Sequence, residues 1–312
     1  MKKLFILAIA AVGLLACTGK NNPSNPNEQG KTDNPQEYMN PNAVDGALPG
    51  KFSVSASRKV QFSQGNLQYC ARTNTWRFAI NQYDTIGVEN ENISASYTGW
   101  IDLFGWGTGN NPTNTSVNEE DYQEFIDWGI NKIANGGSRT DQWYTMSGKE
   151  WQYLLINRPN AQNLFGTGKV NGICGLMILP DNWSIPQGVT FVPGGTKGNT
   201  DGSDGYYYSD SDIDIFDYNA YTISEWAKME KSGAVFLPMA EKGCVRAKTE
   251  IYDTNHVAFY WYSTPLTDGY VQLAFWSSPS NNDGKWSGWV ALWGNWTSPY
   301  YGMLVRLAKE AQ

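Results

Sequence analysis

The stretch Trp286–Trp296, which reads WSGWVALWGNW, places four of the chain's 14 tryptophans within eleven residues. Their 3-4-3 spacing would align all four along one side of an α-helix. Gly288 and Gly294 lie inside the stretch and Pro299 follows it, so a helix here would be costly. The sequence therefore predicts extended chain at this point.

In extended chain the four tryptophans divide by parity, because successive residues of a strand point to opposite faces. Trp289 and Trp293 share one face, and Trp286 and Trp296 share the other. One face can then pack against a core while the other is displayed. We expect Trp286 and Trp296 to be displayed, since core aromatic residues rarely cluster among Gly, Ser and Asn.

Two segments upstream carry the signature of a short helix. Ser147 and Glu150 open SGKEWQYLLINR with capping-box spacing, and Thr222 and Glu225 repeat that spacing in TISEWAKMEKSG, which ends at Gly233. The apolar residues expected to be buried are Trp151, Leu154 and Leu155 in the first segment and Ile223, Trp226 and Met229 in the second.

The rest of the domain is predicted to be mostly strands, with a third helix from Glu119 to Ala134. The apolar runs are short and bounded by turn residues, which is typical of strands. They are Val60–Phe62, Trp76–Ala79, Ile173–Leu179 after the Asn171-Gly172 turn, Ala234–Pro238, Ala258–Tyr262, Tyr270–Trp276, Trp289–Trp293 and Met303–Leu307. GTGKV at Gly166–Val170 is interpreted as a turn. This pattern predicts an α+β fold and not repeated βαβ units.

The N-terminus is typical of an exported lipoprotein. Lys2 and Lys3 precede an apolar run over residues 4–16, which has the order of a signal peptide and is too short to span a bilayer. Leu14-Leu15-Ala16-Cys17 resembles a bacterial lipobox, which implies a signal peptide over residues 1–16 and acylation of Cys17, with palmitate as one of the acyl groups. Thr18 stands where many lipoproteins of the inner membrane carry aspartate, so we expect an outer-membrane, cell-surface location.

Composition divides the mature chain into a tether and one domain. Residues 17–46 are almost entirely Asn, Pro, Gly, Gln and charged residues and are expected to be disordered. Residues 47–312 contain no second linker of that composition and are expected to form a single domain. Removal of Lys2 and Lys3 leaves 21 basic residues against 30 acidic ones, a net charge of −9. That charge disfavours nucleic acid as a partner.

Several sequence blocks, in order along the domain, are similar to those of a known group of proteins. They are GNLQY at 65–69, GWIDLFGWGTG at 99–109, WYTMSGKEWQYLL at 143–155, VNGICGLMILPDNW at 170–183, SEWAKMEKSGAVFLPMA at 224–240 and YGMLVRL at 301–307. The chain resembles secreted lipoproteins of gut Gram-negative anaerobes that are related to formylglycine-generating enzymes and sulfatase-modifying factors. The resemblance implies a C-type-lectin-like α+β domain whose C-terminal segment forms an exposed face used for ligand contact.

The aromatic residues of that segment suit a glycan or an extracellular protein as partner. Indole rings stack on the C–H faces of sugar rings, and amide side chains bind hydroxyl groups. The expected ligand-binding residues are Trp286, Trp296, Tyr300, Tyr301, Asn281, Asn282 and Asn295. Asp210, Asp212 and Asp214 are the candidate ligands of a structural calcium ion, although Ile215 and Tyr221 occupy positions where an EF-hand needs Gly and Glu. A solvated acidic loop is the simpler interpretation, and the sugar-selecting triplets of calcium-dependent lectins are absent.

The sequence gives no reason to expect an enzyme. Formylglycine-generating enzymes use a pair of active-site cysteines. Cys70, Cys174 and Cys244 are widely spaced, permit at most one disulfide among them and match no zinc motif. Cys244 is expected to be a buried, inert thiol. His256 is the only histidine, and no nucleophile motif accompanies it.

Two alternatives to a ligand-binding module remain open. The chain could be a surface assembly protein with protein partners only. It could also be a variable ligand-binding protein of a diversity-generating retroelement, whose diversified stretch would run from about Tyr262 to Gly302.

Overall fold

A computed structural model describes residues 39–194, 196–198, 205–211, 215–239, 243–244, 251–252, 257–264, 272–279, 286–293 and 298–312. The predicted signal peptide, Cys17 and most of the predicted tether lie outside the described residues, as do Asn281, Asn282, Asn295, Trp296, Asp212 and Asp214. None of the helices within the described ranges is long and apolar enough to cross a membrane.

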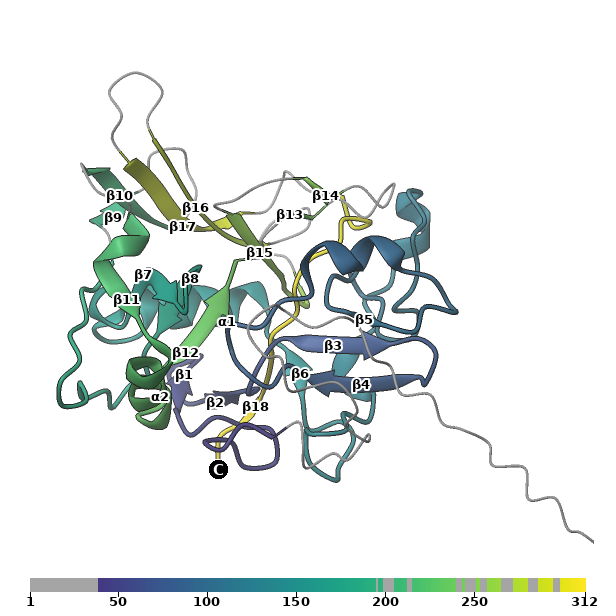
Figure 1. The fold of residues 1–312 in the computed structure, drawn as a ribbon, viewed down its shortest axis with the longest axis horizontal. Coiled ribbons are helices and arrows are strands. Elements are labelled where there is room, and N and C mark those ends of the chain that lie inside the picture. The colour runs from purple at the N-terminus through teal and green to yellow at the C-terminus, as the bar shows by residue number, and fades with distance from the viewer. Residues whose placement is uncertain are drawn as a thin grey trace, which may run out of the picture.

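The described strands form five small sheets around a core of aliphatic and aromatic side chains (Figure 1). The first sheet has the order β1 (Phe52–Ser53), β2 (Lys59–Phe62), β18 (Leu307–Glu310), β6 (Tyr144–Thr145), and the second has the order β4 (Thr75–Phe78), β3 (Leu67–Cys70), β5 (Trp100–Ile101). The third has the order β11 (Ala220–Tyr221), β7 (Phe165–Val170), β8 (Ile173–Ile178), β12 (Val235–Pro238). The fourth pairs β13 (Gly243–Cys244) with β14 (Ile251–Tyr252).

The fifth sheet is the largest and carries the tryptophan-rich stretch. Its order is β15 (Val257–Trp261), β16 (Gln272–Pro279), β17 (Trp286–Trp293), β10 (Gly205–Ser211), β9 (Thr196–Gly198), with antiparallel neighbours throughout. Among the named strands, only β11 and β7 pair in parallel. This mixed, mainly antiparallel arrangement with few helices confirms the predicted α+β class.

Both predicted capping boxes are present and begin the two α-helices. In α1 (Gly148–Gln152), which continues as a π-helical turn η5 (Tyr153–Asn157), Ser147 and Glu150 cap each other reciprocally. Thr222 and Glu225 do the same for α2 (Ile223–Lys231), and Gly233 follows its end with a φ of +98°. Trp151, Leu154, Leu155, Trp226 and Met229 are buried as predicted, whereas Ile223 is 51% exposed.

The predicted helix from Glu119 to Ala134 is wrong. The segment contains two short 3-10 turns, η3 (Glu119–Tyr122) and η4 (Trp128–Ile130). Between them, the backbone of Ile126 pairs with Thr108 and Gly107. Gly129 lies so close to Trp143 that a β-carbon on it would be 1.8 Å from the Trp143 carbonyl oxygen. Contacts with distant segments therefore override the local helical pattern.

Three further expectations are corrected by the strand assignments. GTGKV, predicted as a turn, is most of β7 and pairs with β8 across the Asn171-Gly172 turn, whose positive φ values of 52° and 81° confirm that turn. Met303 and Leu304 make only isolated bridges, and the last strand, β18, begins at Leu307. Part of the acidic segment forms β10 and the 3-10 turn η7 (Ile215–Asn219). The other 3-10 turns are η2 (Gly87–Asn92) and η6 (Ala161–Asn163).

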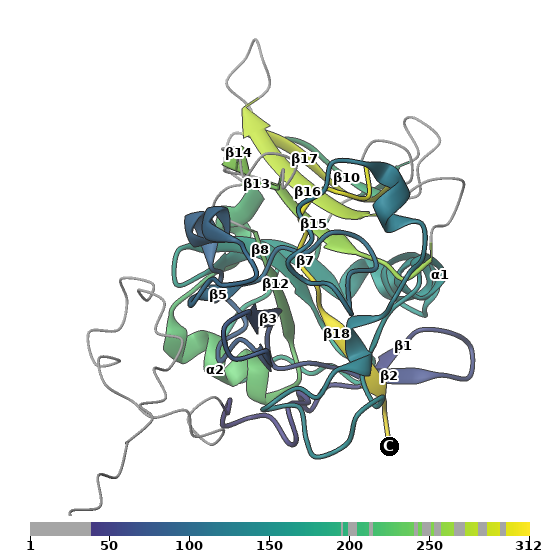
Figure 2. The ribbon, with the colours of Figure 1, turned by 90° about the vertical axis from the view of Figure 1, so that its right-hand side faces the viewer.

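The described chain begins and ends on the side of the molecule opposite the tip of the β16–β17 pair (Figures 1 and 2). In both views the purple N-terminal residues, β1, β2 and the C-terminus lie at the bottom, and β16, β17 and β10 lie at the top. The chain is held to the domain from its first described residues, because the Asn40 amide N–H donates to Gln64 and the Asn42 side chain donates to Glu230.

Candidate functional site

The tryptophan-rich stretch is a strand, as predicted from its glycines. β17 pairs with β16 without interruption from Trp293 opposite Gln272 to Trp286 opposite Pro279, and β10 pairs along its other edge. Three tryptophans, at positions 286, 289 and 293, therefore lie in one eight-residue strand at the centre of the largest sheet. Trp296 lies outside the described residues.

Buried residues lie on both parities of this sheet, because Trp261, which the register aligns with Gln272 and Trp293, is 1% exposed in the main core. Leu292 is 6% exposed, and Tyr260, at the position that β16 aligns with it, is fully buried in the same apolar cluster. α1 and η7, which contribute Trp151 and Phe216 to that cluster, lie against β17. Trp286 has the parity of Leu292, and Trp289 and Trp293 have the opposite parity.

The two predicted tyrosines lie in a turn beside another part of the fold. Tyr300 and Tyr301 are both half-buried, and their rings meet edge to face with centroids 5.1 Å apart. Tyr301 packs against the main core, and the Pro299 carbonyl accepts a hydrogen bond of 2.8 Å from the Trp106 amide. This turn is thereby attached to the Gly105–Trp106 segment.

The predicted calcium ligands fall mostly outside the described residues. Asp210 lies in β10, and Asp212 and Asp214 lie beyond it. Within the parts of the chain that the structure describes, no group of three His, Cys, Asp or Glu side chains is arranged to hold a metal ion. A calcium site at these three aspartates stays a prediction.

The two cysteines at positions 70 and 174 differ in whether they form a disulfide bond. Cys70 is disulfide-bonded, whereas Cys174 is not and is half-buried. Because the chain has four cysteines, only Cys17 and Cys244 remain as the partner of Cys70. A disulfide is the product of an oxidising compartment.

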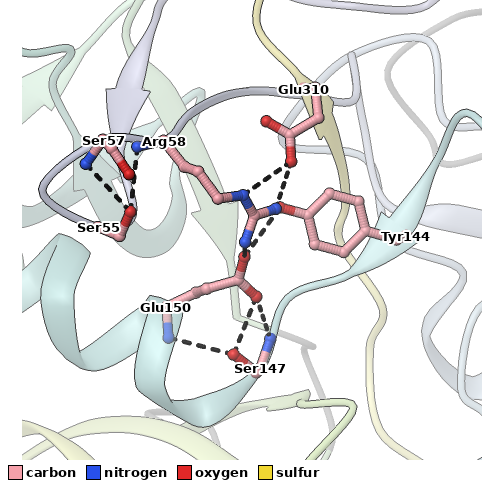
Figure 3. A network of polar contacts seen from close by, with 7 residues as sticks. All are labelled: Ser55, Ser57, Arg58, Tyr144, Ser147, Glu150 and Glu310. Atoms are coloured by element: carbon pink, nitrogen blue, oxygen red, sulfur yellow. Dashed lines mark hydrogen bonds and ion pairs between the residues drawn. The ribbon is translucent and has the colours of Figure 1, made fainter.

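A cluster of charged groups joins three parts of the chain that are distant in sequence (Figure 3). Arg58, in the loop between β1 and β2, contacts Glu150 of α1 at 2.9 Å and Glu310 of β18 at 3.0 Å. Its guanidinium also donates to the Tyr144 hydroxyl at 3.1 Å, and Tyr144 donates to Glu150 at 3.0 Å. Sequence reasoning missed this cluster, because no local pattern connects residues 58, 144, 150 and 310.

The hydrogen bonds of this cluster hold its side chains in fixed positions. The second oxygen of Glu150 accepts from the amide and hydroxyl of Ser147 at 2.8 and 2.9 Å, so both oxygens are occupied. Hydrogen bonding to Glu310 raises the pKa of Arg58, and burial together with Glu150 raises the pKa of Tyr144. Arg58 and Tyr144 thus stay protonated as donors near neutral pH.

Comparison of the chain with models of protein families, with curated proteins and with solved structures finds no match.

Proposed function

We propose that this chain is an exported, lipid-anchored protein of the outer membrane and cell surface that binds a glycan or protein ligand through its C-terminal aromatic strands. The observation that carries the proposal is the concentration of three tryptophans in β17, the central strand of the largest sheet. Aromatic residues concentrated on strands form the contact surfaces of many binding sites.

The positions of the N-terminus and of the aromatic strands at opposite ends of the domain support this proposal. The described chain starts at the end opposite the tip of the β16–β17 pair (Figure 2). An anchor at Cys17 would therefore join the domain at one end and leave the aromatic strands at the other. Asn40 and Asn42 are already hydrogen-bonded to the domain, so the proposed tether shortens to residues 17–38, which would allow an end-to-end distance of about 25 Å as flexible chain.

The disulfide of Cys70 supports export, because cytosolic proteins rarely keep structural disulfides. The resemblance to exported lipoproteins with C-type-lectin-like domains supports the same assignment and the finer fold. Contact with the ligand is proposed to be independent of calcium and of catalysis.

The test is direct binding by the mature, acylated protein in detergent. It is presented to a panel of host and bacterial polysaccharides and to surface proteins of the same cells, with and without EDTA. We expect binding that survives EDTA and is lost in the Trp286→Ala/Trp296→Ala double variant, while Ile223→Ala, which removes an exposed apolar side chain from α2, serves as the matched control. Binding to proteins alone would favour the assembly protein, and absence of binding to either class would reject the proposal.

The anchor has its own test. Growth with a radioactive or clickable palmitate analogue should label the full-length protein and leave Cys17→Ala unlabelled. Equal labelling of both chains would show that Cys17 is not the acylated residue.

A further inference from the structure

Four exposed apolar side chains lie on two neighbouring segments, the loop over residues 182–194 and the run from η7 to the start of α2. They are Ile185 (50% exposed), Val192 (45%), Tyr218 (37%) and Ile223 (51%). The two segments are bonded to each other, because the Val192 amide donates to the Asn219 side chain at 2.8 Å and that side chain donates back to the Val192 carbonyl at 2.9 Å. The four side chains therefore lie on adjoining surface around α2, which we call the α2 patch.

The loop over residues 182–194 is fixed to the domain by other apolar side chains. Val189 is buried in the apolar cluster that contains Trp226 of α2, and Phe191 is half-buried against the same cluster. The inward positions of the loop are thus already filled, and Ile185 and Val192 remain at the surface. Contact of such side chains with water is unfavourable, and exposed apolar surface of this kind is often used for association.

The charges around the α2 patch are positive. The loop over residues 182–194 contains no Asp, Glu, Lys or Arg, and Lys228 and Lys231 are exposed on α2. In these two segments, residues 182–194 and 215–231, each carboxylate is already engaged: Glu225 in the capping box, Glu230 in hydrogen bonds with Asn42 and Gln82, and Asp217 in an ion pair with Lys169. The patch therefore suits a partner that combines an apolar interior with an anionic surface.

The proposed tether joins the domain at α2. The Asn42 side chain donates to Glu230 of α2 at 2.7 Å, and a β-carbon on Gly50 would lie 2.2 Å from the carbonyl oxygen of Gly233, just after the helix. In both views α2 lies at the end of the domain away from the tip of the β16–β17 pair (Figures 1 and 2). Residues 17–38 reach only about 25 Å as flexible chain. An anchor at Cys17 would therefore hold the α2 end close to the lipid surface, at a high effective concentration.

We propose that the α2 patch docks on the surface of the bilayer that holds the acyl anchor. Ile185, Val192 and Ile223 enter the interface, Tyr218 lies at the level of the headgroups, and the two lysines of α2 lie beside lipid phosphates. The inference rests on the proposed lipid anchor, because so small an apolar surface binds a membrane only weakly by itself. Docking deepens the proposed function, since it orients the domain with the β16–β17 pair away from the membrane.

The experiment maps contact with lipid by photocrosslinking. The mature, acylated protein is reconstituted into vesicles of phosphatidylethanolamine and phosphatidylglycerol that contain a phospholipid with a diazirine near its headgroup, and adducts are located by peptide mass spectrometry. We expect adducts in the peptides that contain residues 182–194 and 215–231. Peptides with Val117 and Ile130, which are 54% and 46% exposed, are the control within the same sample and should carry none.

A matched pair of variants tests the side chains. Ile185→Asp/Ile223→Asp should reduce the adducts in both segments by about tenfold or more, because a carboxylate opposes entry into an anionic interface. Val117→Asp/Ile130→Asp adds the same charges at similarly exposed apolar positions and should leave the adducts unchanged. Adducts that persist in Ile185→Asp/Ile223→Asp would overturn the assignment to the α2 patch.

Flotation of the vesicles tests the anchor separately. Wild-type protein that does not float with the vesicles would reject the proposed lipid anchor, and the docking with it. Protein that floats but carries no adducts in the two segments would overturn the docking and leave the anchor standing. Equal adducts in the two segments and in the control peptides would also overturn it, because the domain would then have no fixed orientation on the membrane.

Discussion

Several buried polar residues in this domain are held by hydrogen bonds to residues in other segments. Asp102 is one of them, and its ionisation should affect the stability of the fold. Its carboxylate accepts hydrogen bonds from the Ile86 amide at 2.9 Å and the Asn90 side chain at 2.8 Å, while Asn90 in turn accepts from the Asp102 amide at 2.9 Å. Burial outweighs these bonds and raises the pKa of Asp102 to about 6.

A raised carboxyl pKa stabilises the folded state below the unfolded pKa, and that stability is lost as the pH rises through the folded value. We therefore expect the wild type to lose about 2 to 3 kcal/mol of unfolding free energy, relative to Asp102→Asn, between pH 4 and pH 7. Urea denaturation of both proteins across this range measures it. A constant difference between the two proteins would show that Asp102 is ionised normally in the folded domain.

The sequence could not identify these residues, because the roles of buried polar groups depend on contacts that no local pattern records. Arg306 lies in the predicted terminal segment YGMLVRL, yet it is fully buried and donates to Gln82 at 2.7 Å and to the Phe236 carbonyl at 2.8 Å. Gln82 also donates to Glu230 of α2 at 2.9 Å. Composition alone would place such an arginine at the surface.

At the level of elements, prediction succeeded where the determinants are local. Both capping boxes and the Asn171-Gly172 turn lie within a few residues of the structure they specify. The strand character of β17 follows likewise from its own glycines. The helix over residues 119–134 failed because the segment pairs with residues 107–109 and packs against Trp143.

Two glycines test this distinction between local and distant determinants. A β-carbon on Gly129 would meet the Trp143 carbonyl oxygen at 1.8 Å, so Gly129→Ala should destabilise the domain by about 3 kcal/mol or more. Gly172 has nothing within 4 Å and a φ of +81°, so Gly172→Ala should cost only about 1 kcal/mol of backbone strain. The urea midpoints of the two variants measure these two losses of stability. Similar midpoints would show that the packing around Gly129 is looser than described.

For the whole molecule, the α+β class was predictable from strand and helix signals, but the arrangement of the sheets was not. The pairing of β10 with β17, and hence the alignment of Tyr207 with Trp289, joins segments about 80 residues apart. The sequence identified the tryptophan-rich strand but not its partners. Alternation along the strand predicted two faces for the tryptophans, and the structure has buried residues on both of them, Leu292 on one and Trp261 on the other.

The disulfide is a whole-molecule feature that links the fold to the proposed export. If Cys17 is acylated, the partner of Cys70 must be Cys244, because Cys174 is not disulfide-bonded, and Cys244 is then not the inert thiol expected from the sequence. Non-reducing peptide mapping should therefore find Cys70 joined to Cys244. Reduction should lower the unfolding free energy by about 2 to 5 kcal/mol. A Cys70–Cys17 peptide would contradict the lipid anchor, and a Cys70 peptide with a free thiol would contradict the structure.

The central claim is that a lipid-anchored domain presents its aromatic sheet to a ligand outside the cell. It is tested most directly by incubating intact Gram-negative cells that produce the full-length chain with a fluorescent form of whichever glycan or protein the binding panel identifies. We predict labelled cells for the wild type, and unlabelled cells both for Cys17→Ala and for Trp286→Ala/Trp296→Ala. Wild-type cells that stay unlabelled, or Cys17→Ala cells labelled as strongly as the wild type, would contradict this account.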